Sequence, residues 1–271
     1  MSTAVIFWLQ ILSAGLYGGA AAQEWTVVRR RGHVSVTPAL WLGAAALALH
    51  TVAVATEVLN GGEVLNLDLG YALSLFTWLV ILQFLFAALF LKIDLLGLIL
   101  FPLAGIVLLV EAFVPAGQAL RINVGQPALL GHLVLSLLAY GTLTIAAVQA
   151  GLLGCQEGHL RRKRVGLMSR ILPPMQPMER LLFHLLRIGF GLLTLVIITG
   201  SIFSEQIFGQ PFTFDHKNVL SLVAWAVFGL LLWGHSHYGW RGRTAVRWTL
   251  SGYALLLLAY FGVRLILELK A

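Results

Sequence analysis

The stretch Phe208-Gly209-Gln210-Pro211-Phe212-Thr213-Phe214-Asp215-His216-Lys217 leads, through Asn218, into an apolar run from Val219 to Trp233. Only 11% of the residues in this chain are charged, yet Asp, His and Lys stand side by side here, next to aromatic rings and a proline. The pattern predicts an outer loop followed by the start of a membrane helix. Most of the remaining sequence has the composition of apolar helix, so we expect chemistry to collect in this stretch.

Composition sets the class of protein. Of the 271 residues, 59% are hydrophobic and 11% are charged, whereas an average soluble domain has about 25% charged residues. No polar stretch is long enough to form a separate soluble domain. The sequence therefore predicts an all-α protein, a polytopic bundle of membrane helices in contact with lipid.

Hydropathy divides the chain into about eight helices of membrane-spanning length. The predicted spans are residues 3–22, 38–57, 69–91, 95–113, 129–153, 182–203, 218–233 and 246–267. We expect one integral domain with an N-terminal four-helix part, residues 1–128, and a second part, residues 129–271. A cleavable leader that ends near Ala22 is the alternative to the first span.

Basic residues set the predicted topology. Three clusters, Arg29 to Arg31, Arg161 to Arg164 and Arg241 to Arg243, all fall on the same side of the predicted bundle. Positive charge favours the cytoplasmic side, so we expect both termini outside. The net charge of +7 lies in these short loops, and without a basic groove with stacking aromatics we expect no nucleic-acid partner.

The predicted topology divides the eight histidines into an outer and an inner group. His50, His132 and His216 fall in or near the outer half of the membrane, and the other five belong to the inner side. Imidazoles are axial ligands of haem iron, and the haem propionates attract cations. The cations on the outer side are Arg121, Lys217 and Arg264.

Each of these residues also has a structural explanation. His50 and His132 could make hydrogen bonds between helices, although ionisable groups inside a membrane often serve function. His216 could be a solvated loop residue. Ser136, Tyr140 and Thr144, at steps of four, form a polar stripe that favours helix packing over a site. The loop phenylalanines could form an interfacial aromatic belt.

The sequence lacks the motifs of several enzyme classes. It contains no phosphate-binding glycine loop, no H-E-x-x-H pair and no nucleophile elbow. The single cysteine, Cys155, forms no internal disulfide and has no C-x-x-C partner for thiol exchange. The outer histidines are not spaced as a compact zinc site. We therefore expect a protein that is not an enzyme.

The loop from Phe208 to Val219 resembles the cytochrome c assembly family, integral membrane proteins that handle haem at the outer face of the membrane. The family loop reads approximately W-G-x-x-W-x-W-D-P-K-E-T and aligns here without a gap. Trp225 falls on a downstream family Trp, and Gly131-His132-Leu133 resembles a helix that carries a haem-associated His. The similarity covers about residues 129 to 268.

The resemblance implies roles for Asp215 and Lys217 in the loop and for His132 in the helix. The sequence departs from the family at Phe208, Phe212 and Phe214, which replace tryptophans, and at His216, which replaces a proline. A phenylalanine can stack on a porphyrin but lacks the indole N–H. The departures fit the shorter branch of the family, which includes the proteins called YpjD and HemX.

Three functions follow as alternatives. The first is haem handling for cytochrome c biogenesis in the bacterial inner membrane, in which His132 binds iron, His50 or His216 lies opposite, and Phe212 and Phe214 stack on the porphyrin. A maturation protein would be the partner. The second is a cofactor-free regulator whose basic loop, Arg161 to Arg164, contacts a cytoplasmic protein or anionic lipid. The third is a subunit of a small-solute permease, for which broken helices and repeats would be expected.

Overall fold

The structure is a computed structural model of the 271-residue chain. It describes residues 3–31, 37–61, 64–67, 69–91, 93–113, 120–123, 126–161, 173–202 and 216–259. Within these residues the chain forms eight α-helices, which confirms the predicted all-α class. Six of the described helices are long and apolar enough to cross a membrane, and α4 (Gly97–Phe113) is a shorter apolar helix. The chain is therefore a multi-pass membrane protein.

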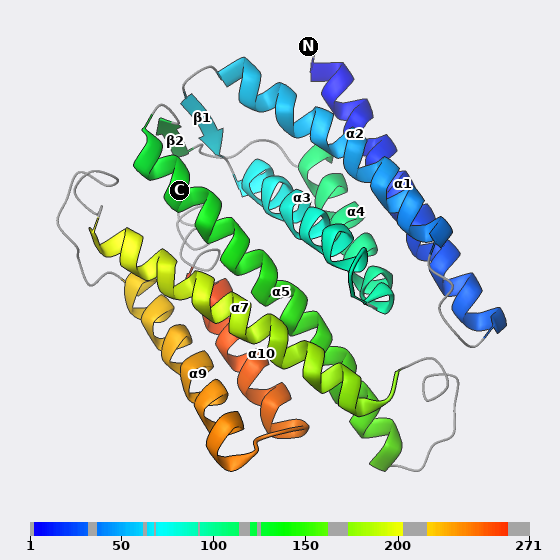
Figure 1. Cartoon of the computed structure of the whole chain (residues 1–271). Coiled ribbons are helices and arrows are strands. Elements are labelled where there is room, and N and C mark those ends of the chain that lie inside the picture. Colours follow the sequence, from blue (N-terminus) through cyan, green and yellow to red (C-terminus); the bar gives the residue numbers. More distant parts are fainter. Residues whose placement is uncertain are drawn as a thin grey trace. The chain divides into compact units, whose positions relative to one another are not determined.

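The chain forms two compact units, Met1–Gly125 and Gln126–Ala271. In unit 1, α1 packs against α2 and α4, and α3 packs against the same two helices (Figure 1). The helices of this unit are α1 (Thr3–Arg31), α2 (Thr37–Gly61), α3 (Leu69–Ala88) and α4 (Gly97–Phe113), with a 3-10 turn, η1 (Asp94–Leu96), before α4.

Small residues and aromatic rings form the core of unit 1. A side chain at Gly105 of α4 would place its Cβ 3.3 Å from the backbone oxygen of Ala14 in α1, so glycine permits this close approach. Tyr17 stacks on Phe101 with ring centroids 6.0 Å apart, and Phe84 meets Phe101 edge-on. All three rings are fully buried.

Two short strands in unit 1 were not predicted. β1 (Val64–Leu67) pairs antiparallel with β2 (Leu120–Asn123), so that Asn66 lies opposite Arg121. The predicted spans leave Arg121 in the outer loop between residues 113 and 129, whereas its backbone belongs to β2. Four residues are too few for an alternating pattern to stand out, which explains why hydropathy missed the pair.

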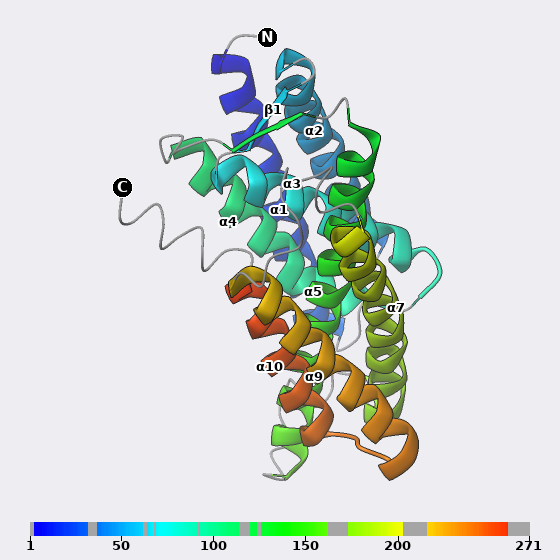
Figure 2. The same ribbon diagram turned by 90° about the vertical axis from the view of Figure 1, so that its left-hand side faces the viewer.

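Unit 2 consists of four helices, with α5 against α7 and α10, and α9 against α7 and α10 (Figures 1 and 2). They are α5 (Pro127–Arg161), α7 (Met175–Ile202), α9 (His216–Tyr238) and α10 (Arg243–Leu257). A Cβ at Gly189 of α7 would lie 2.6 Å from the Leu143 side chain of α5. Glycine therefore lets these two long helices pack closely.

The helix ends differ from the predicted spans. α5 continues past Leu153 to Arg161, and α7 begins at Met175 rather than Leu182. Hydropathy falls where polar residues begin, but these polar turns remain helical because one face stays packed. Gln156, for example, is buried and donates to the Pro173 carbonyl over 2.9 Å. The predicted eighth span lies partly outside the described residues.

Candidate functional site

Three helices of unit 2 bring the candidate residues together. His132 lies in the second turn of α5 and is half-buried, and Thr199 lies near the end of α7. His216 is the first residue of α9, not a loop residue as predicted, and Lys217 follows it. Because α7 runs antiparallel to both α5 and α9, these helix ends meet at one end of the unit.

A hydrogen bond fixes the His132 ring. Its Nδ1 lies 3.0 Å from the Thr199 hydroxyl. The single hydrogen of that hydroxyl is donated to its own helix, where the Leu195 carbonyl lies at 2.8 Å. When that hydrogen is given to the helix carbonyl, the hydroxyl accepts from the ring, and in this tautomer a neutral imidazole donates at Nδ1 and carries its lone pair on Nε2.

This arrangement is the one expected of an imidazole that binds a metal. Metal-binding histidines commonly donate their other ring N–H to an acceptor, which fixes the tautomer and the direction of the lone pair. Thr199 supplies that acceptor for His132. The chemistry of this imidazole therefore fits the role of a ligand to haem iron.

Gly200 shapes the space beside the ring. A Cβ at this position would lie 3.1 Å from Cε1 of His132, closer than ordinary van der Waals contact. The absence of a side chain at Gly200 lets the imidazole lie against α7. The sequence analysis missed both Thr199 and Gly200, because a threonine and a glycine in an apolar run carry no signal of their own.

Lys217 brings positive charge to the same end of the unit. Its side chain is exposed, and its ammonium is close enough to act electrostatically on the His132 ring. The other described cations of unit 2 belong to the opposite halves of its helices, on α5, α7 and α10, or to the turn between α9 and α10. Lys217 is therefore the described cation placed to meet an anionic group bound at His132.

A second layer supports the helices that hold these residues. The Trp225 indole N–H of α9 donates to the Thr194 hydroxyl of α7 over 2.9 Å, and the Trp225 ring stacks on Phe190 at 5.5 Å. Thr194 donates in turn to the Phe190 carbonyl. Trp225, aligned from the sequence with a family Trp, thus holds α9 on α7 within the bundle.

His50 belongs to unit 1 and has a different environment. Its ring is fully buried, with Nε2 3.0 Å from the Ser74 hydroxyl and Nδ1 3.4 Å from the Tyr17 hydroxyl. These contacts join α1, α2 and α3. Either nitrogen would have to leave its partner to bind iron, so the contacts in this structure are those of a residue between helices.

Several residues named from the sequence belong to the loop before α9 or to the C-terminal end of the chain. Phe212, Phe214, Asp215 and Arg264 lie outside the described residues, as do Phe208 and His33. The polar stripe on α5 is resolved: Ser136 donates to the His132 carbonyl, and Thr144 contacts both the Tyr140 carbonyl and the Tyr253 hydroxyl at 2.8 Å. These bonds are helix packing, as the sequence analysis favoured.

Three histidines at the other end of unit 2 contact the backbone. His159 lies 2.8 Å from the Cys155 carbonyl and His237 lies 3.1 Å from the Trp233 carbonyl. His235 lies 2.9 Å from the Trp240 carbonyl and stacks on Phe183, with centroids 3.5 Å apart. In the described part of the chain, no three His, Cys, Asp or Glu side chains form a group that could hold a metal ion.

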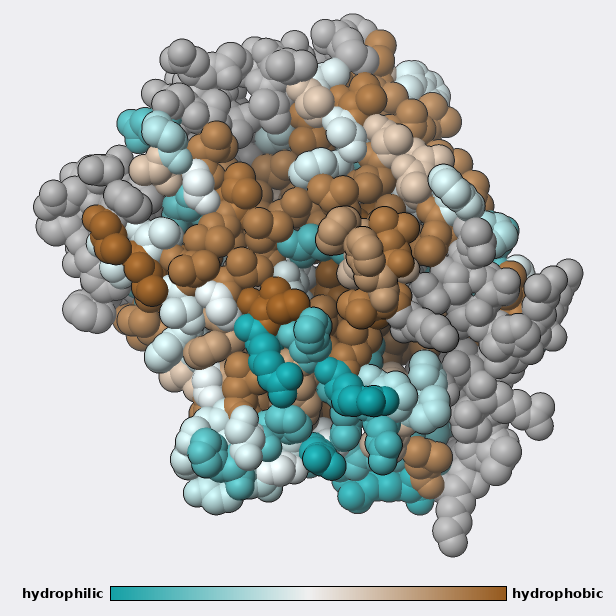
Figure 3. All heavy atoms as spheres, in the orientation of Figure 1, coloured by the Kyte–Doolittle hydropathy of each residue, from teal (hydrophilic) through white to brown (hydrophobic). Residues whose placement is uncertain are grey.

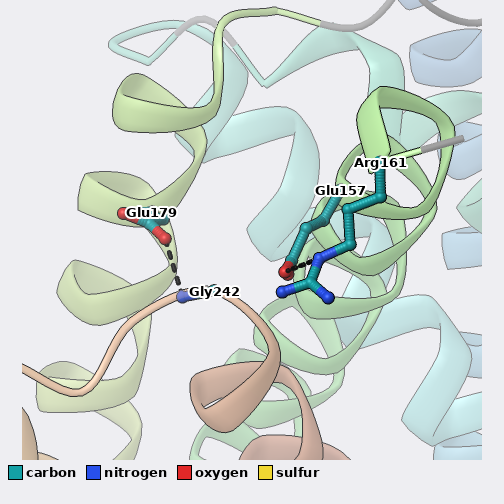
Figure 4. Close-up of polar contacts among 4 residues, drawn as sticks. All are labelled: Glu157, Arg161, Glu179 and Gly242. Atoms are coloured by element: carbon teal, nitrogen blue, oxygen red, sulfur yellow. Dashed lines mark hydrogen bonds and ion pairs between the residues drawn. The ribbon is translucent and has the colours of Figure 1, made fainter. Parts of the chain in front are cut away.

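The turn between α9 and α10 is fastened to α7 at this end. Gly242 has a φ of 54°, a conformation that favours glycine, and its backbone N–H donates to Glu179 over 2.8 Å. Nearby, Arg161 lies 3.4 Å from Glu157 on α5 (Figure 4). Both carboxylates therefore have partners within unit 2.

Comparisons with known proteins identify relatives over most of the chain. The family described as Cytochrome C assembly protein matches residues 40–270. The inner membrane protein YpjD of Escherichia coli strain K12 is 39% identical over 171 residues, which are 63% of this chain and 64% of that protein. The match thus spans less than two-thirds of the length of YpjD.

Two further relatives are more distant. Protein HemX of Brevibacillus brevis is 24% identical over 217 residues, 79% of this chain and 80% of that protein. The cytochrome c biogenesis protein CcsA of Trichodesmium erythraeum is 30% identical over 91 residues, 34% of this chain and 26% of that protein. With the family match covering all of α3 to α10, the chain belongs to the cytochrome c assembly protein family.

Proposed function

We propose that this chain handles haem at the outer face of the bacterial inner membrane during cytochrome c biogenesis, without itself being an enzyme. Family membership and the relative named as a cytochrome c biogenesis protein support the haem-related role. The relative named as an inner membrane protein, together with six apolar helices, supports the location.

The observation that carries the proposal is the hydrogen bond from His132 to Thr199. It orients an imidazole whose lone pair is on Nε2 at the end of unit 2 where Lys217 lies. When bound, haem would supply an iron atom for Nε2 and propionates for a cation. His132 is thus the proposed iron ligand and Lys217 the proposed propionate partner.

The remaining assignments depend on the loop before α9. His216 starts α9, one residue before Lys217, which favours it over the doubly hydrogen-bonded His50 as the ligand opposite His132. Phe212 and Phe214 would stack on the porphyrin beside Asp215, which matches the family loop. Arg121 and Arg264 are further candidates for the propionates.

The alternative is a cofactor-free regulator or scaffold. One observation favours it: the relative whose name refers to cytochrome c biogenesis, CcsA, matches only 34% of this chain, whereas the match to HemX extends over 79%. The permease alternative gains no such support. The one proline within α4, Pro102, leaves that helix unbroken, and a discontinuous helix was the expected sign.

An absorption spectrum tests the proposal. Protein purified in detergent is measured as isolated and after addition of hemin, for the wild type, His132→Ala and His216→Ala. His237→Ala is the matched control, since this exposed histidine is at the other end of α9. We expect a Soret band that His132→Ala abolishes or shifts and that the control retains. A wild type without a Soret band under either condition would favour the regulator.

A further inference from the structure

The exposed side chains of α7 change from mainly polar to apolar between Arg187 and Ile188. From Met175 to Arg187 its exposed side chains are mainly polar, and Arg180, His184 and Arg187 among them follow helical spacing. From Ile188 onward the exposed large side chains are apolar: Ile188, Leu195, Ile198 and Ile202. Such a switch on a lipid-facing helix marks the edge of the hydrocarbon layer.

The two neighbouring helices show the same switch. On α10, Arg243 and Arg247 are exposed, and Leu250 and Leu257 follow. On α9, which runs the opposite way, the exposed aliphatic residues end before Trp233, and the exposed Ser236, His237 and Tyr238 follow it.

Contacts between side chains place the three switches within about one helical turn of one another. On α7, Phe183 stacks on His235 and Phe190 stacks on Trp225, so Arg187, which lies between them, is level with the turn of α9 around Leu230. A Cβ at Gly252 of α10 would lie 2.9 Å from Phe228. Because α9 and α10 are antiparallel, Arg247, five residues before Gly252, is level with Trp233, five residues after Phe228.

The charges at this end of unit 2 are unbalanced. The described carboxylates of the unit, Glu157 and Glu179, are engaged with Arg161 and with the Gly242 backbone N–H. Within the described part of unit 2, no ion pair joins an acidic group to Arg187 or Arg247. Figure 3 shows hydrophilic side chains gathered over the lower part of this unit.

We infer that Arg187 and Arg247 bind the phosphates of anionic phospholipids at the membrane surface. Arginine can lay its aliphatic stem along apolar surface and hold its guanidinium at the level of the headgroups. Basic sites between membrane helices recognise anionic headgroups in this way. The exposed Trp233 at the same level is typical of the membrane interface.

This level also implies that α7 extends well beyond the membrane. The segment from Met175 to Arg187 rises 1.5 Å per residue, so about 18 Å of α7 would stand outside the hydrocarbon layer. Arg180, on the same face, is seven residues before Arg187 and thus about 10 Å further from the lipid. It provides a matched control of equal charge.

Native mass spectrometry of the full chain measures the bound lipid directly. The protein is equilibrated in detergent with equal amounts of phosphatidylglycerol and phosphatidylcholine, for the wild type, Arg187→Gln, Arg247→Gln and Arg180→Gln. We expect retention of phosphatidylglycerol over phosphatidylcholine. Removing one headgroup-level arginine should lower that ratio about fivefold, because each contributes about 1 kcal/mol to binding anionic lipid. Arg180→Gln should change it less than twofold.

Three results would overturn the inference. The wild type could show no lipid preference, or Arg180→Gln could lower the ratio as much as Arg187→Gln, which would indicate net charge alone. Alternatively, free inorganic phosphate or a soluble polyglutamate peptide at equal concentration could displace the lipid completely, which would indicate a soluble anion or an acidic protein as the partner. Circular dichroism of each variant verifies that the helices are retained.

Discussion

His132 Nδ1 of α5 lies 3.0 Å from the Thr199 hydroxyl of α7, and that hydroxyl also lies 2.8 Å from the Leu195 carbonyl of its own helix, to which it can donate its hydrogen. The direction of this bond follows from the one hydrogen that a hydroxyl has to give. Two helices distant in sequence thus set the tautomer of one imidazole. If this bond orients an iron ligand, variants around it should change haem binding, whereas a bond that only packs α5 on α7 should affect stability alone.

Thr199→Val tests the bond directly. Valine keeps the shape of threonine but removes the acceptor, so the His132 ring loses its orientation. Loss of such an outer partner commonly lowers metal affinity about 10- to 100-fold. We expect hemin titrations, followed at the Soret band, to show weakening in that range.

The control for this substitution is Thr194→Val on the same helix. Thr194 accepts a hydrogen bond from Trp225, not from His132. The Thr194→Val substitution should lower the free energy of unfolding by about 1 kcal/mol and leave hemin affinity within twofold of the wild type. Equal losses of affinity in both variants would mean that α7 packing, and not the orientation of His132, is responsible.

Gly200→Ala tests the space beside the ring. The new methyl group would lie 3.1 Å from Cε1 of His132, so the imidazole must move by a few tenths of an ångström. We expect a shifted Soret maximum or a severalfold weaker hemin affinity, measured by the same titration. Gly191→Ala is the control, because its Cβ would meet no atom within 4 Å. A spectrum unchanged by Gly200→Ala would place the haem away from this ring.

The sequence predicted the helices well because an apolar run of membrane length has few other structures available to it. It predicted their ends less well, since α5 and α7 keep a packed face where hydropathy has already fallen. Gln156 is an example of a polar residue buried in such a turn. The predicted orientation, with both termini outside, stays a prediction.

The candidate site was predicted only in part. His132 and Lys217 stood out because ionisable residues are rare in this chain. Thr199 and Gly200 matter through their position beside His132, which depends on how α5 and α7 pack and is not encoded in any local pattern. His50 looked equivalent to His132 in the sequence, but the structure shows it between two hydroxyls in the other unit.

Glu179→Ala tests the connection between α7 and the turn before α10. The variant removes the acceptor of the Gly242 backbone N–H, which lies 2.8 Å from the Glu179 carboxylate. A hydrogen bond to a charged group contributes about 1.5–3 kcal/mol. We expect a loss of unfolding free energy in that range, measured by reversible SDS titration in mixed micelles.

Arg161→Ala is the comparison for this variant. It removes the i,i+4 pair with Glu157, in which the arginine side chain is 62% exposed. Pairs of this kind contribute about 0.3–0.5 kcal/mol. If Arg161→Ala cost as much as Glu179→Ala, the turn would not depend on the Gly242 hydrogen bond.

Ser74→Ala tests the network around His50 in unit 1. Ser74 lies 3.0 Å from His50 Nε2, and the ring is fully buried. Removing the hydroxyl leaves a buried ring nitrogen without this partner, which costs about 1–3 kcal/mol. Tyr17→Phe should cost less, because the Tyr17 hydroxyl is 3.4 Å from Nδ1 and the bond is weaker. SDS titration of both variants measures the order.

A triple variant shows whether Ser74→Ala loses stability because a buried polar group is left unpaired or because hydrogen-bond energy is lost. Replacing all three polar groups, in Tyr17→Phe/His50→Leu/Ser74→Ala, leaves no unpaired polar group and should recover much of the stability lost in Ser74→Ala. Thr26→Ala on α1 is the control, since that exposed hydroxyl bonds only to its own helix, and it should cost less than about 0.5 kcal/mol. A triple variant less stable than Ser74→Ala would show that the network contributes specific hydrogen-bond energy, beyond the mere satisfaction of buried polar groups.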